Sequence, residues 1–273
     1  ELNDTTAHKI GTSIALFFRE KNPDVKNIVV GRDMRLSSKS LANALIEGLC
    51  TAGLNVINVG VVSSEMTYFA VGHYKYDGGV MVTASHNPAE YNGFKLCREQ
   101  AIPVSFETGI DRISKLTKQY HPLRGEHLGK VIVSDIFADY KKHVLKFASN
   151  LRHLRVVIDA GNGMAGKTIP LVCEGLPIEI IPLYFELDGS FPNHEANPLK
   201  PENMVDLQKK VRETRAHLGV AFDGDADRCV FVDEMGRIIG CDIITALIAK
   251  QILEREKGAT ILYDLRSSWI VPE

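Results

Sequence analysis

Apolar residues follow two rhythms along the first half of the chain. Short β-branched runs at 25–30, 54–59 and 79–83 have the pattern of buried strands. Between them, residues 38–50 and 64–74 place apolar side chains at helical spacing, and each segment starts with a serine that we interpret as a helix cap. This alternation of strand and helix predicts a mainly parallel sheet with helices on its faces.

The same alternation starts again after an amphipathic helix predicted over 135–148, with Ile136, Tyr140, Val144 and Phe147 on one side. The further strands are predicted at 155–159, 177–184 and 217–222, and the helices between them at 163–174 and 201–215. We place a domain boundary near Asn150. The predicted fold class is therefore α/β, with two consecutive domains (1–150 and 151–256) whose mainly parallel sheets are flanked by helices.

The last residues predict a third unit that is incomplete. A helix over 247–255 and a strand over 259–264 are expected, and a lone strand cannot bury its own faces. Residues 257–273 are accordingly predicted to start a truncated third domain. The first residue is Glu1 rather than Met, which predicts processing or a shortened chain.

Charge and cysteine content narrow the class of protein. A formal net charge of -2 gives no electrostatic reason to expect nucleic acid or an anionic membrane as a partner, and no apolar stretch is long enough to span a bilayer. The five cysteines are widely spaced and form no C-x-x-C pair, which argues against disulfides and a zinc site. We expect most of them to be small core residues of a cytoplasmic protein.

Three carboxylates stand close together in the run D-G-D-A-D-R at 223–228. Like charges at this spacing repel one another, and a hard divalent cation with oxygen ligands offsets them well. We therefore predict that Asp223, Asp225 and Asp227 bind Mg²⁺ and that Arg228 contacts a phosphate. A hairpin turn between two apolar runs is the simpler alternative.

An EF-hand is excluded at this position. The three aspartates and Glu234 match loop positions one, three, five and twelve, but Arg228 stands where that loop needs glycine, and the flanking residues have the pattern of strands.

A literal G-x-G-x-x-G lies at 161–166, after a predicted strand, with Glu186 ending the next strand. This spacing is typical of dinucleotide sites and supports an oxidoreductase as an alternative function. A tight strand-to-helix turn needs the same glycines for steric reasons alone, and we favour that interpretation.

The run T-A-S-H-N-P at 83–88 follows a predicted parallel strand, and α/β folds place ligands at the carboxyl ends of such strands. Pro88 disfavours a helix at Asn87, so Ser85 should lie in an exposed loop. No G-x-S-x-G elbow is present, which makes a hydrolase triad a poor fit. A phosphorylated serine beside a magnesium site fits better.

Together these motifs resemble the α-D-phosphohexomutase family, with bacterial phosphomannomutase/phosphoglucomutases as the most similar members. The resemblance rests on T-A-S-H-N-P with Y-N-G-F-K at 91–95, on D-G-D-A-D-R, and on N-P-L-K-P-E-N at 197–203. The run at 31–38 also resembles a family loop, although a capped helix start explains it equally well.

The resemblance implies reversible transfer of phosphate between the 1 and 6 positions of a mannose or glucose phosphate. Ser85 would carry the phosphate, with a hexose 1,6-bisphosphate as intermediate and activator, and Ser85 would join the three aspartates in binding Mg²⁺. Lys95 would transfer a proton or stabilise charge, His86 is a second candidate for that role, and Arg228 would contact the phosphoserine.

The resemblance also implies that the sugar-recognition loop of a third domain and the phosphate-binding loop of a fourth are missing here, so that the chain alone should be inactive or nearly so. Three alternatives stay open: a phosphoglucosamine mutase, a dinucleotide-dependent oxidoreductase that uses Gly161–Gly166, and a non-catalytic metal-binding α/β module.

Overall fold

The first of two five-stranded sheets has the strand order β4-β3-β1-β2-β5. The computed structural model describes residues 2–122, 128–148 and 151–273. The strands of this sheet are β1 (Asn27–Arg32), β2 (Asn55–Val61), β3 (Gly78–Val82), β4 (Phe94–Arg98) and β5 (Val131–Val133). Three neighbouring pairs are parallel, and β4 runs antiparallel to β3 at one edge.

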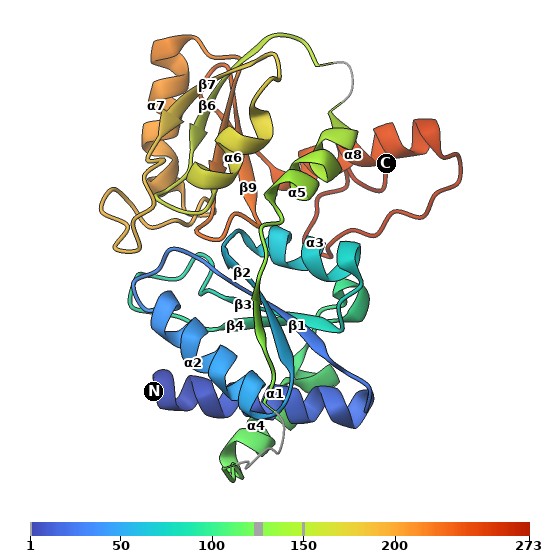
Figure 1. Cartoon of the computed structure of the whole chain (residues 1–273). Coiled ribbons are helices and arrows are strands. Elements are labelled where there is room, and N and C mark those ends of the chain that lie inside the picture. Colours follow the sequence, from blue (N-terminus) through green and yellow to red (C-terminus); the bar gives the residue numbers. More distant parts are fainter. Residues whose placement is uncertain (1, 123–127, 149–150) are drawn as a thin grey trace.

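Helices cover both faces of this sheet (Figure 1). They are α1 (Asp4–Lys21), α2 (Ser38–Thr51), α3 (Ser64–Tyr74) and α4 (Asp111–Lys118), with the short helices η1 (Glu99–Ala101) and η2 (Phe106–Ile110). Ile14, Leu45 and Ile28 are fully buried between α1, α2 and the sheet, and Met66 and Met81 are fully buried on the α3 side. Each such side chain contributes about 1.5–3 kcal/mol of transfer free energy, so both faces stabilise the sheet.

The second sheet has the order β10-β9-β8-β6-β7 and is parallel only where β6 pairs with β7 and β8. Its strands are β6 (Leu154–Asp159), β7 (Ile178–Leu183), β8 (Leu218–Phe222), β9 (Cys229–Asp233) and β10 (Ile238–Ile239). The helices of this half are α5 (Phe137–Val144), η3 (Leu145–Phe147), α6 (Ala165–Cys173), η4 (Pro201–Met204), α7 (Val205–Thr214) and α8 (Cys241–Arg255).

The α/β class is confirmed, and every strand and helix predicted up to residue 255 forms. Most bounds shift little, but the helix predicted over 247–255 begins at Cys241, and the one predicted over 135–148 ends at Val144 and is followed by the short helix η3. The predicted strand over 259–264 is wrong: within the described residues this segment pairs with no strand, and Leu262 is 90% exposed. A strand needs a neighbour to satisfy its backbone groups, and an apolar run cannot supply one. Phe147 is also exposed rather than packed with Ile136. The domain boundary placed near Asn150 lies outside the described residues.

The two sheets meet through α3, α5 and α6 (Figure 1). The Lys167 ammonium on α6 donates to the Val61 carbonyl at the end of β2, at 2.7 Å. On α5, Phe137 and Tyr140 pack against the core on the α3 side of the first sheet, and the Lys141 ammonium lies 2.9 Å from the Glu174 carboxylate, which follows α6. These contacts bring the loop after β3 against the loop after β8.

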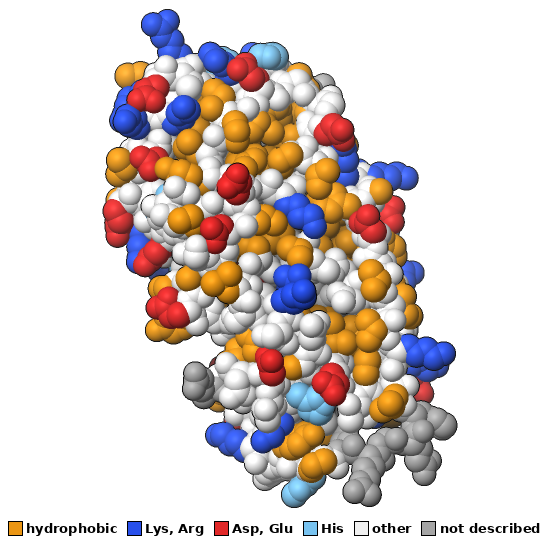
Figure 2. Space-filling view, turned by 60° about the vertical axis from the view of Figure 1, so that its left-hand side comes forward, with side chains coloured by type: hydrophobic (Ala, Val, Ile, Leu, Met, Phe, Trp, Pro, Cys, Tyr) orange, Lys and Arg blue, Asp and Glu red, His pale blue; other side chains and the backbone are white. Residues whose placement is uncertain are grey.

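The outer surface mixes all side-chain types. On the face shown in Figure 2, basic and acidic side chains are interspersed with apolar ones. Among residues 2–122, 128–148 and 151–273, the helices are too short or too polar to cross a lipid bilayer. The five cysteines are free thiols; Cys97 is buried, whereas Cys241 is exposed, so the prediction that they are core residues holds for only some of them.

Candidate active site

Ser85 lies three residues beyond the end of β3 in a strained backbone conformation. Its φ of 55° is in the left-handed region, which side-chain-bearing residues adopt at a cost. The Ser85 N–H donates to Thr83 Oγ1 at 2.8 Å, which fixes the turn. The residue is only 7% exposed, so the prediction of an openly exposed serine is wrong. The strain is maintained because the surrounding groups hold this loop in a single conformation.

The run at 223–228 forms the loop of a β-hairpin between β8 and β9, which are antiparallel. Ala226 has φ 62°, and its N–H donates to the Asp223 carbonyl at 3.0 Å. The Asp223 N–H in turn donates to the Arg228 carbonyl at 3.2 Å. The hairpin alternative and the carboxylate cluster are therefore compatible, because the hairpin turn is what gathers the carboxylates.

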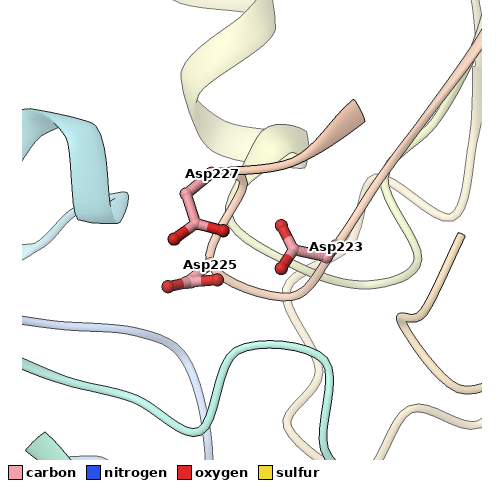
Figure 3. A group of neighbouring side chains, drawn as sticks. All are labelled: Asp223, Asp225 and Asp227. Carbon is pink, nitrogen blue, oxygen red and sulfur yellow. The ribbon is translucent and has the colours of Figure 1, made fainter. Parts of the chain in front are cut away.

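The three carboxylates converge on one point (Figure 3). Asp223, Asp225 and Asp227 each offer an oxygen within 4.8 Å of the others, and the first two are fully buried. Asp225 Oδ1 is buried without a hydrogen-bond partner among the described residues. A buried carboxylate oxygen without a donor is costly, and a cation removes that cost. Oxygen-only donors at this spacing fit a hard divalent cation such as Mg²⁺.

Ser85 faces this cluster directly. Its hydroxyl donates to Asp223 Oδ2 at 2.8 Å, and Arg228 Nη2 donates to the same hydroxyl oxygen. Arg228 also binds Asp223 through Nε at 3.0 Å and lies 3.4 Å from Asp227 Oδ1. One guanidinium thus contacts the serine oxygen and two of the three carboxylates.

Lys95 reaches the cluster from β4 of the first sheet. Its ammonium lies 2.6 Å from Asp225 Oδ2 and also binds Asp227 Oδ2. Burial alone would lower the pKa of Lys95, but the two carboxylates outweigh it and raise the pKa. Lys95 is therefore charged at neutral pH. In this arrangement the charged ammonium pairs with both carboxylates.

His86 packs beside the serine and Arg228. Arg228 Nη2 donates to His86 Nδ1, which lies 3.5 Å from Ser85 Oγ. Burial and the Arg228 charge lower the pKa of His86, so its imidazole is neutral at pH 7. Because Nδ1 accepts from Arg228, the imidazole nitrogen that lies 3.5 Å from Ser85 Oγ is already engaged in this structure.

The carboxylates differ in acidity. Burial, together with the Asp225 and Asp227 charges, raises the pKa of Asp223 to about 7. Burial opposes ionisation of Asp225 as well, yet Lys95 outweighs it and lowers the pKa of that carboxyl. Asp223, which accepts the serine hydrogen, is thus the more basic of these two groups.

All seven predicted site residues therefore lie in one network, but sequence reasoning missed three further contributors. Ser64 does not cap α3 as predicted; its hydroxyl binds Asp225 Oδ2, and its N–H donates to the Asp225 carbonyl at 3.1 Å. Glu65 lies near the cluster, and burial, together with the aspartate charges, raises its pKa to about 8. A serine or glutamate at a helix start carries no signal of such a role.

The third missed residue is Arg35, in the run at 31–38. It is 1% exposed, and its guanidinium donates to the backbone carbonyls of the serine loop. Ser38, the other predicted cap, makes no side-chain cap hydrogen bond; its hydroxyl donates to Asp33 instead. The sequence did contain a feature that could have predicted this role. Asp33 and Arg35 stand just after a buried strand, where an unpaired charge is costly, so a buried ion pair was to be expected there.

The glycines at 161–166 serve packing. A Cβ at Gly166 would lie 2.1 Å from the Phe185 carbonyl oxygen, and one at Gly163 would lie 2.7 Å from the Gly224 carbonyl oxygen. The Met164 N–H, at the start of α6, donates to Gly224 at 2.9 Å. The turn at 161–166 therefore supports the hairpin loop. The hairpin loop lies against the glycine backbone that a dinucleotide would otherwise approach.

Comparisons with known proteins agree on the family and the fold. The family model "Phosphoglucomutase/phosphomannomutase, alpha/beta/alpha domain I" matches residues 1–123, and the model of domain II matches residues 137–236. A phosphomannomutase of Vibrio cholerae is 40% identical over 276 residues, which cover 98% of this chain and 60% of the relative. A phosphomannomutase of Escherichia coli K12 is 39% identical over 278 residues, again covering 98% and 60%.

Solved structures give the same result. A phosphoglucomutase/phosphomannomutase family protein of Burkholderia thailandensis superposes with a TM-score of 0.90 and 33% identity, covering 99% of this chain and 60% of that one. A protein of Thermus thermophilus, at TM-score 0.86 and 23% identity, shares the fold. The chain spans about 60% of the length of the curated relatives it matches.

Proposed function

The chain belongs to the phosphoglucomutase/phosphomannomutase family, and from that premise we propose that Ser85 accepts and donates a phosphoryl group in a phosphohexomutase reaction. The substrates we propose are mannose or glucose phosphates, interconverted between their 1- and 6-phosphates through a hexose 1,6-bisphosphate. One observation carries the proposal. The Ser85 hydroxyl lies 2.8 Å from Asp223 Oδ2, beside Arg228 and at the edge of three converging carboxylates.

The chemistry we propose is an in-line phosphoryl transfer. The Ser85 oxygen attacks the phosphorus of the bisphosphate, a P–O bond to Ser85 forms, and the P–O bond to the sugar breaks. The Ser85 hydroxyl, which donates to Asp223 Oδ2 in this structure, loses its proton as the bond to phosphorus forms. The sugar oxygen leaves with the electron pair of the broken bond and takes up a proton to become a hydroxyl, so one proton is lost and one is gained. Transfer in the other direction regenerates the free serine, so no net phosphate is consumed.

Charge stabilisation is the main task of the surrounding side chains. Arg228 already donates to Ser85 Oγ, so its guanidinium can contact oxygens of a phosphate attached there. Lys95, fixed by Asp225 and Asp227, adds a second positive charge, and His86 stays neutral beside them. Because these groups are positioned before the reaction, little reorganisation is needed when negative charge moves.

A magnesium ion is the cofactor we propose, since the family generally depends on Mg²⁺. Asp223, Asp225 and Asp227 would hold it, and it would neutralise phosphate oxygens. The Asp225 oxygen that has no partner among the described residues supports this assignment.

The test is phosphorylation of Ser85 itself. The purified chain is incubated with Mg²⁺ and glucose or mannose 1,6-bisphosphate, and the peptide containing residues 76–95 is examined by mass spectrometry. We expect one added phosphoryl group on Ser85, and none on a Ser85→Ala variant. Ser40→Ala is the matched control, because Ser40 is exposed and lies outside the network; it should be labelled as the unsubstituted chain is.

The outcomes separate the alternatives. Labelling from glucosamine 1,6-bisphosphate in strong preference to the other two would point to a phosphoglucosamine mutase. Tight Mg²⁺ binding without any labelling of Ser85 would instead support a metal-binding module without phosphate transfer.

A further inference from the structure

We propose that Arg35 is the positioning residue for Ser85, and that residues 188–197, in the loop between β7 and η4, hold Arg35 in place. The consequence for phosphate transfer rests on the proposed function, whereas the consequence for loop geometry does not. A buried cation from the end of one strand thus determines where the serine lies.

The hydrogen bonds of the two terminal nitrogens of Arg35 go to the serine loop. Nη2 donates to the carbonyls of Ser85 at 2.8 Å and Asn87 at 2.6 Å. Nη1 donates to the carbonyls of Pro88 at 2.6 Å and Tyr91 at 3.1 Å. Four backbone oxygens spread over seven residues therefore converge on one planar fork. Only a guanidinium offers donors in this fixed arrangement; a lysine ammonium is a point charge.

An ion pair with Asp33 orients the Arg35 guanidinium. Arg35 Nε lies 3.3 Å from Asp33 Oδ2, and both side chains are completely buried. Asp33 Oδ1 accepts the Arg35 backbone N–H at 3.0 Å. Nε makes no hydrogen bond among the described residues, so this ion pair is its polar partner. The pair fixes the direction in which the fork points.

The loop after β7, in the second half of the chain, also contacts Arg35. The Phe191 ring stacks over the guanidinium, with Arg35 Cζ 5.0 Å from the ring centroid, a favourable cation–π contact. A Cβ placed on Gly189 would lie 2.6 Å from Arg35 Cα, so the backbones touch there. Only glycine permits this approach.

Residues 188–197 are themselves anchored to the end of β6. The Asp188 N–H donates to the Asn162 carbonyl at 3.0 Å, and the Asn193 amide donates to Asn162 Oδ1 at 2.8 Å. His194 Nε2 lies 3.0 Å from Asp159 Oδ2. A continuous set of contacts therefore runs from the second sheet through Phe191 and Arg35 to the serine loop. Asp223, the partner of Ser85, comes from that same sheet.

The experiment uses variants that act on Arg35 from each side. Arg35→Lys keeps the charge but loses the fork, Phe191→Leu removes the ring, and Gly189→Ala pushes on the Arg35 backbone without touching Ser85. Arg112→Lys is the control, because Arg112 forms an exposed ion pair with Glu20. Hydrogen–deuterium exchange is followed over the peptide containing residues 83–92 and over peptides from α2 and β6. The rate of Ser85 phosphorylation by hexose 1,6-bisphosphate is measured in parallel.

We expect exchange in 83–92 to rise about tenfold in all three variants, with α2 and β6 unchanged. Phosphorylation should slow by about tenfold or more, because small displacements of a nucleophile are costly. Phe191→Tyr, which keeps the ring, should restore both values. If the unsubstituted chain is never phosphorylated, the proposed function fails, and the exchange data still decide the positioning. Unchanged exchange in 83–92, or a uniform rise throughout the chain, would overturn the proposal.

Discussion

The two loops that meet at the site are stabilised in opposite ways. The serine loop after β3 surrounds a buried cation, and four of its carbonyls between Ser85 and Tyr91 accept hydrogen bonds from Arg35. The hairpin loop after β8 gathers three anions, and one oxygen of Asp225 has no donor among the described residues. The protein thus completes the first loop itself, while the second needs a cation to be complete.

This difference separates positioning from binding. A preorganised nucleophile costs no ordering during the reaction, so the serine loop is fixed by the fold. A metal site must remain partly unsatisfied to attract its ion, and here Lys95 and Arg228 offset the charge only in part. Substitutions in the two loops should therefore act on different quantities: stability and geometry in one, ion affinity in the other.

The largest effect is expected from Asp33→Asn, which leaves the Arg35 cation buried without its counter-ion. We expect a loss of about 3–5 kcal/mol in the free energy of unfolding, measured by urea denaturation. Asp24→Asn, at an exposed site, should change it by less than about 0.5 kcal/mol. A small effect at Asp33 would mean that the serine loop does not depend on the buried pair.

Asp225→Asn should act on the other loop. It removes the charge of a buried carboxylate that offers an unpaired oxygen, so Mg²⁺ affinity measured by titration calorimetry should fall by at least about a hundredfold. Glu234→Gln is the matched control, because Glu234 is exposed and stands at the position where an EF-hand would have its last ligand. Equal losses at both positions would contradict the assignment of the three aspartates.

Ser64→Ala tests a supporting contact of the hairpin loop. The Ser64 hydroxyl binds Asp225 Oδ2, while Oδ1 has no hydrogen-bond partner among the described residues. Without it the carboxylate is less well oriented, and Mg²⁺ affinity should fall by about tenfold. Ser40→Ala should leave the affinity unchanged, and an unaltered affinity in Ser64→Ala would remove Ser64 from the site.

The smallest effect concerns pH. Burial would lower the pKa of His194, but its hydrogen bond and ion pair with Asp159 outweigh burial and raise the pKa above 6.5. The charged form therefore stabilises the fold fully below pH 6.5, and this contribution is lost as the pH rises through the raised pKa. His194→Gln should be less stable than the unsubstituted chain in acid, and the gap should narrow in alkali. A gap that widens with pH in urea denaturation would contradict this sign.

Local pattern was sufficient for the elements that carry the site. Alternating apolar runs predicted the α/β class, the strand before Ser85 and the hairpin at 223–228. They did so because buried strands and the helices that cover them need apolar residues at regular spacing in the sequence. The apolar and polar pattern gave wrong predictions where a residue's structure depends on a contact with a distant part of the chain. Residues 259–264 are apolar enough for a strand but lack a neighbour in the described part of the chain, and Ser38 and Ser64 bind carboxylates rather than capping helices.

The sequence by itself determined which chemical groups are available: a serine at a strand end, three clustered aspartates and their neighbouring arginine. Tertiary structure alone decided which of them meet. Lys95 binds Asp225 across 130 positions, Ser85 binds Asp223 across 138, and Phe191 covers Arg35 from the other sheet. The reason is physical. Neighbouring residues leave a pattern through shared backbone geometry, whereas contacts between distant side chains depend on how two sheets pack, and no local rule encodes that.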